Sequence, residues 1–137
     1  MTAAVALVAL ILNALVGVFM FVRWLGRSAG SLPPLVYFHI ATASVSLALW
    51  IAYLVVGRPA LLAWAVFVVL TATNALGDTL LVRGWRARHS VSSGSLVRNY
   101  LGAARDVLSG KRPASMIHAI LAPVAYFSVL LAALGVG

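Results

Sequence analysis

Two histidines, His39 and His118, lie a few residues inside two apolar stretches that are each long enough to cross a bilayer. A titratable ring inside a membrane span is costly to bury and usually serves a site. Neutral imidazole is also the commonest side chain among metal ligands. Two such rings on different helices therefore predict a bound metal ion or haem between them, whereas either ring alone would be expected to hydrogen-bond a neighbouring helix.

The chain around these rings has the composition of an integral membrane protein. Of its 137 residues, 64% are hydrophobic and 9% are charged, and the mean hydropathy is +1.08. A helix needs about 20 apolar residues to cross the hydrocarbon layer, and four stretches reach that length, at about 3–25, 34–56, 60–82 and 115–136. These stretches are apolar on every side rather than alternating, so we predict one all-α domain, a membrane four-helix bundle, instead of a β-barrel. The chain has no cysteine, which excludes thiolate metal sites.

The basic residues that give the net charge of +8 are distributed along the chain as membrane topology predicts. This distribution favours a role in topology over nucleic-acid binding. Only Arg58 lies between the second and third spans. The other basic residues follow the first span or connect the third to the fourth: Arg23, Arg27, Arg83, Arg86, Arg88, Arg98, Arg105, Lys111 and Arg112. By the positive-inside rule, both basic connections are cytoplasmic and both termini lie outside, in a plasma membrane of the bacterial inner-membrane type.

The long connection, residues 83–114, contains a predicted short interfacial helix at 95–109. Ser95 is expected to cap its start, Gly110 to end it in a left-handed conformation, and Pro113 to stop it from continuing into the fourth span. The residues of the helix divide into an apolar face, with Val97, Tyr100, Leu101, Ala104 and Leu108, and an opposite face, with Arg98, Gly102, Arg105 and Ser109.

A weak internal repeat relates the second and fourth spans, which both contain the pattern P-x4-H-x3-A-x-V. The pattern runs from Pro34 through His39 in one span and from Pro113 through His118 in the other. The first and third spans share a smaller echo, Asn13-Ala14-Leu15 and Asn74-Ala75-Leu76. Two hairpins related by an axis along the membrane normal would place the two histidines opposite each other.

Depth brings a carboxylate into the same layer as the two rings. Counting from the cytoplasmic ends of the spans at 1.5 Å per residue, His39 lies about 7 Å deep, His118 about 5 Å and Asp78 about 6 Å. Asp78 is therefore expected to accept the second N–H of a ligating ring. Small residues on the faces of the two histidines leave room for a cofactor, and four cations at the cytoplasmic end could meet haem propionates: Arg23, Arg83, Lys111 and Arg112.

With two intramembrane histidines on different helices of a four-span bundle, the chain resembles the membrane b-type cytochromes. The resemblance rests on the four spans and on His39 and His118. It implies one haem b held by both histidines and electron transfer, with a membrane quinone as the redox partner.

Three other hypotheses remain open from the residues alone. His39, His118 and Asp78 have the composition of a two-histidine, one-carboxylate site for Zn or non-haem Fe in a membrane enzyme. Asp78 beside Asn74 could instead carry a proton or cation in a small transporter, which would need to form a homodimer. A non-catalytic accessory subunit of a larger membrane or respiratory complex is the third.

Overall fold

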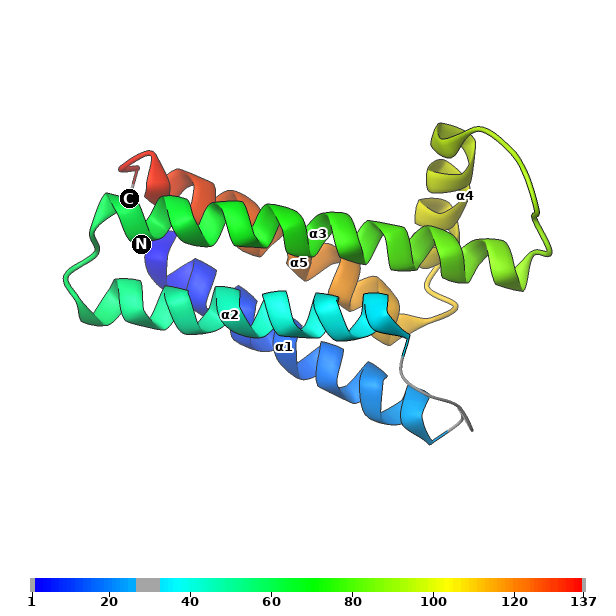
Figure 1. The fold of residues 1–137 in the computed structure, drawn as a ribbon, viewed down its shortest axis with the longest axis horizontal. Coiled ribbons are helices and arrows are strands. Elements are labelled where there is room, and N and C mark those ends of the chain that lie inside the picture. Colours follow the sequence, from blue (N-terminus) through cyan, green and yellow to red (C-terminus); the bar gives the residue numbers. More distant parts are fainter. Residues whose placement is uncertain (1, 27–32, 137) are drawn as a thin grey trace.

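The computed structural model describes residues 2–26 and 33–136, so Arg27 lies outside the described residues (Figure 1). They form five α-helices and no strand, which confirms the all-α prediction. The helices are α1 (Thr2–Leu25), α2 (Pro34–Val55), α3 (Ala60–Arg88), α4 (Leu96–Leu108) and α5 (Pro113–Ala133).

Four of these helices, α1, α2, α3 and α5, are long and apolar enough to cross a membrane. Their large aliphatic and aromatic side chains are widely exposed, as on Val8, Val68 and Phe127. Helix α3 continues to Arg88, six residues beyond the predicted span end at residue 82. Hydropathy detects only the part of a helix that matches the hydrocarbon, and the arginines of the last turn, Arg86 and Arg88, suit the negative end of the helix dipole.

The four long helices form a bundle in which neighbours in space differ from neighbours in sequence. Helix α1 packs mainly against α5, and α2 packs mainly against α3. In the described part of the chain, α2 and α5 have no close backbone approach and face each other diagonally, as do α1 and α3. The two termini lie at one end of the bundle (Figure 1), where Thr2 Oγ1 donates to the carbonyl of Val136 at 3.0 Å.

The tightly packed core occupies the half of the bundle nearest the termini. The rings of Trp50 and Tyr53 stack with their centres 4.5 Å apart, and both side chains are buried. Trp50 Nε1 donates to the carbonyl of Ala3 at 3.3 Å, which joins α2 to α1. Buried alanines on α1, among them Ala6 and Ala9, allow the neighbouring helices to approach closely.

The short helix α4 crosses the opposite, basic end of the bundle at a steep angle to α3 (Figure 1). Its predicted ends are confirmed. Ser95 Oγ accepts a hydrogen bond from the Arg98 amide at 3.2 Å, and Gly110 adopts a left-handed φ of 77°. Pro113 becomes the first residue of α5, where its missing N–H costs nothing.

The buried residues of α4 belong to neither of the two faces that the sequence predicted for this helix. Asn99, Ala103 and Val107 are buried, while most of the predicted apolar face stays exposed, including Val97 and Leu101. Gly102, predicted on the polar face, packs so closely on Trp85 of α3 that an added Cβ would lie 2.6 Å from Trp85 Cζ2.

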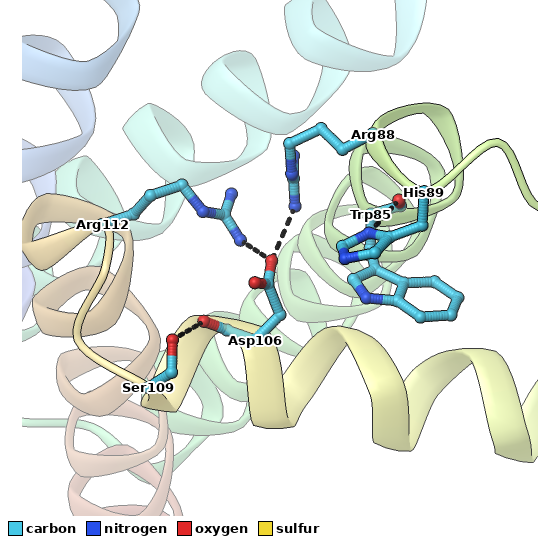
Figure 2. A network of polar contacts seen from close by, with 6 residues as sticks. All are labelled: Trp85, Arg88, His89, Asp106, Ser109 and Arg112. Atoms are coloured by element: carbon cyan, nitrogen blue, oxygen red, sulfur yellow. Dashed lines mark hydrogen bonds and ion pairs between the residues drawn. The ribbon is translucent and has the colours of Figure 1, made fainter.

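One carboxylate ties α4 to both α3 and α5 (Figure 2). Asp106 Oδ2 lies 3.2 Å from Arg88 Nη2 and 2.5 Å from Arg112 Nη2. Desolvation would raise the pKa of the Asp106 carboxyl, but the hydrogen bond from Arg88 and the charges of Arg112, Arg88 and His89 outweigh it and lower the pKa. The side chain of His89 is not part of this link; it stacks on Trp85 with ring centres 4.9 Å apart.

Candidate functional site

The two intramembrane histidines meet in the middle of the bundle. The ring centres of His39 and His118 are 6.2 Å apart, and the ring planes are inclined at 71°. His39 comes from α2 and His118 from α5, the diagonal helices, so side chains alone span the space between these helices at this level. Both histidines are the sixth residue of a helix that begins with proline, at Pro34 and Pro113, which explains why they reach the same level.

The orientation of the His39 ring is set by a backbone carbonyl of α3. Its Nδ1 atom lies 3.1 Å from the carbonyl oxygen of Thr73. A carbonyl can only accept, so Nδ1 carries the proton and a neutral ring has its lone pair on Nε2. Nε2 has no hydrogen-bond partner among the described residues, and this is the nitrogen that a metal would need.

The His118 ring is held in the same way by α1. Its Nδ1 atom lies 3.2 Å from the carbonyl oxygen of Asn13, which again assigns the proton to Nδ1 and the lone pair to Nε2. The side-chain Oδ1 of the same asparagine is buried and has no hydrogen-bond partner among the residues that the structure describes. Buried polar atoms without partners are rare in folded proteins and often accompany functional sites.

Each ring also lies against a glycine one helical turn beyond its carbonyl partner. A Cβ added to Gly77 would lie 3.1 Å from His39 Cε1, and a Cβ added to Gly17 would lie 3.4 Å from His118 Cε1. The Nδ1–Cε1 edge of each imidazole therefore packs on a neighbouring helix that lacks a side chain at that point. The two glycines make room for the rings in this orientation.

These contacts repeat with two-fold regularity: a carbonyl at one position and a glycine four residues later receive a histidine from another helix. Asn13 and Gly17 correspond in this way to Thr73 and Gly77. The sequence echo between α1 and α3 pairs Asn13 with Asn74, one residue away from the structural equivalence of Asn13 with Thr73. This echo does not predict the glycines, because Gly17 lies four residues after Asn13 but Gly77 lies three residues after Asn74.

Asp78 does not join the rings as predicted. Its side chain is on the exposed side of α3 and is hydrogen-bonded to Tyr100 of α4. The charge of Asp78, together with burial and this hydrogen bond, raises the pKa of the Tyr100 hydroxyl. The carbonyls of Thr73 and Asn13, rather than the Asp78 carboxylate, accept the Nδ1–H of the two rings. Within residues 2–26 and 33–136, no three His, Cys, Asp or Glu side chains gather as a metal site.

The four predicted propionate partners all lie toward the basic end, but none contacts a histidine ring in the described structure. Arg23 lies in the last turn of α1 with its guanidinium 5.6 Å from the centre of the Phe19 ring. Arg83 is exposed on α3, and Lys111 is exposed between α4 and α5. Arg112 is already engaged by Asp106.

The donor set of the histidine pair fits a metal or a haem iron. Two imidazole side chains from different helices approach to 6.2 Å between ring centres, and each would bind through its Nε2 atom. Both rings have the tautomer that ligation through Nε2 requires, and backbone carbonyls hold their orientation as outer-shell partners do in metal sites.

Comparisons of the chain with protein-family models, with curated proteins and with solved structures find no match.

Proposed function

We propose that this chain is a membrane haem protein that binds one haem b between His39 and His118 and takes part in electron transfer. The observation that carries the proposal is the geometry of the pair. Two imidazole rings come from diagonal helices, each is held through Nδ1 by a carbonyl, and their centres are 6.2 Å apart. Bound haem b would supply one-electron chemistry, with a membrane quinone as the expected partner.

The protein's own groups would have three tasks in this function. The Nε2 atoms of His39 and His118 would bind the iron, and the carbonyls of Thr73 and Asn13 would hold the ring orientation. With two strong ligands in place, no position would remain open for oxygen or water, which favours electron transfer over chemistry at the metal. Gly17 and Gly77 would keep the ring edges close to α1 and α3.

The proposed orientation places the basic end of the bundle in the cytoplasm and both termini outside. Eight of the described cations, from Arg23 to Arg112, lie at that end, and Arg58 lies at the other. The excess of Lys and Arg in short connections sets orientation in a membrane of the bacterial inner type. The site would then lie in the cytoplasmic half of the bilayer.

An absorption spectrum of the purified protein tests the proposal. Cells expressing the chain should be supplied with a haem precursor, so that limited haem synthesis does not decide the result. We expect about one haem b per chain, with a Soret band and a sharp α-band on reduction. A colourless preparation that also fails to bind added haem would overturn the proposal, and Zn or Fe without porphyrin would favour a metal-ion site.

A further inference from the structure

A groove runs along the outer face of α5, on a side of the bundle that the histidine site does not use. Its volume is about 620 Å³, and its lining is almost entirely apolar. The lining includes Leu108 from α4 and, along α5, Ala119, Ile120, Pro123, Phe127 and Leu131. From residue 119 to residue 131 an α-helix rises about 18 Å, which is similar to the depth of one leaflet of a hydrocarbon layer about 30 Å thick.

One end of this groove adjoins the C-terminal end of α4, at the basic end of the bundle. Leu108 is both the last residue of α4 and part of the groove lining. Arg105 lies one turn before Leu108, and Lys111 follows three residues after it. Side chains three residues apart on a helix are neighbours, so Arg105 lies beside Leu108, and Lys111 belongs to the short connection that follows the end of α4.

The positive charge at this end of the groove is not neutralised by the protein. Asp106 is the one carboxylate in the described connection, and Arg88 and Arg112 already share it. Arg105 and Lys111 have no ion pair among the described residues. The groove therefore begins near two exposed cations and continues along α5 as a shallow apolar surface.

We propose that this groove binds an anionic phospholipid, with one acyl chain along α5 and the phosphate between Arg105 and Lys111. Charge complementarity selects this occupant. A second copy of the chain would bring its own cations to the same end of the groove, and a neutral lipid would gain nothing from them. Basic residues next to an anionic headgroup contribute about 1 kcal/mol each, so the pair should favour an anionic over a zwitterionic lipid by roughly 30-fold.

Native mass spectrometry of the delipidated protein in a neutral detergent tests this inference. Phosphatidylglycerol and phosphatidylcholine with identical acyl chains should be added separately, and the dissociation constant of the first bound lipid measured. We expect phosphatidylglycerol to bind at least 10-fold more tightly. The double variant Arg105→Gln/Lys111→Gln should abolish this preference without changing helix content.

Two further variants separate the headgroup from the groove. Val124→Trp fills the groove and should weaken both lipids, because it leaves the cations in place and removes the space for the acyl chain. Arg98→Gln is the matched control, since Arg98 is an exposed arginine near the other end of α4. It should bind both lipids as the unmodified protein does.

Three results would overturn the proposal. Equal affinity for the two lipids would remove the role of the cations. Full competition by glycerol phosphate, which has no acyl chain, would show a simple anion site without the groove. A change of oligomeric mass in Val124→Trp, with lipid binding unaltered, would show that a second copy covers this face.

Discussion

The imidazole rings of His39 and His118 approach to 6.2 Å between centres, although their helices make no close backbone contact with each other. Each ring instead depends on the helix beside it, since Thr73 of α3 holds His39 and Asn13 of α1 holds His118. All four long helices therefore contribute to this one site.

Replacing either intramembrane histidine should abolish haem binding. Loss of one of the two imidazole ligands would weaken haem binding and change the spectrum of any haem that remains. In His39→Ala and His118→Ala we expect the Soret band of the purified protein to fall below about one tenth of its original intensity, because weaker binding lets the haem be lost during purification. His89→Ala is the control, because His89 stacks on Trp85 outside the bundle core. Retention of full haem in His39→Ala would contradict the assignment.

The two glycines beside the rings should respond differently to alanine. At Gly77 the new Cβ would lie 3.1 Å from His39 Cε1, closer than at Gly17, where the distance to His118 Cε1 is 3.4 Å. Alanine in a helix gains about 0.5–1 kcal/mol over glycine, whereas overpacking costs about 1–3 kcal/mol. Gly77→Ala should therefore destabilise and Gly17→Ala should be close to neutral. Unfolding in denaturing detergent measures both, and the reverse order would show that the rings move freely.

Gly102→Ala should displace α4 from α3. The added Cβ would lie 2.6 Å from Trp85 Cζ2, a distance at which either the Trp85 ring or one of the helices must shift. The chain has no cysteine, so spin labels at Ala87→Cys and Leu101→Cys report the α3–α4 distance without interference. We expect a longer and broader distance distribution. Combining Gly102→Ala with Trp85→Leu should restore it, and failure of this rescue would place the effect elsewhere.

The docking of α4 should weaken in acid. Arginine contacts lower the pKa of Asp106 in the folded protein relative to its usual value of 3.8. Its stabilising contribution is complete above that usual pKa and is lost as the pH falls through the lower, folded-state pKa. The same spin-label pair should therefore separate below about pH 4. Asp106→Asn should show the separated state at every pH, and an identical acid response in this variant would exclude Asp106 as the cause.

Asp78→Asn should lower the pKa of Tyr100. The charge of Asp78 is the largest cause of the raised pKa of this hydroxyl, and asparagine removes the charge while retaining a hydrogen-bonding group. Ultraviolet titration of the unmodified protein and of the variant, each against its Tyr100→Phe version, measures the shift. Haem content should not change, because Asp78 is not a partner of either ring. Loss of haem in Asp78→Asn would instead support the role predicted from depth.

Much of the fold follows from local features of the sequence. Four apolar stretches predict four long helices, because length and hydropathy are properties of each segment alone. Ser95 and Gly110 predict the ends of α4 for a similar reason, since capping depends on residues within one turn. The repeat that includes Pro34 and Pro113 predicts that His39 and His118 lie opposite each other, and their rings do meet.

The rotation of each helix about its axis could not be predicted from the sequence. Helices that are apolar on every side contain no amphipathic pattern that would show which face turns inward. Depth alone placed Asp78 with the histidines, but the rotation of α3 turns Asp78 toward Tyr100 and brings the carbonyl of Thr73 to His39. A backbone carbonyl is present at every residue, so the residue type does not predict which carbonyl accepts a hydrogen bond from a histidine ring. Packing of all four helices selects those at Thr73 and Asn13, and with them the nitrogen that each ring leaves free.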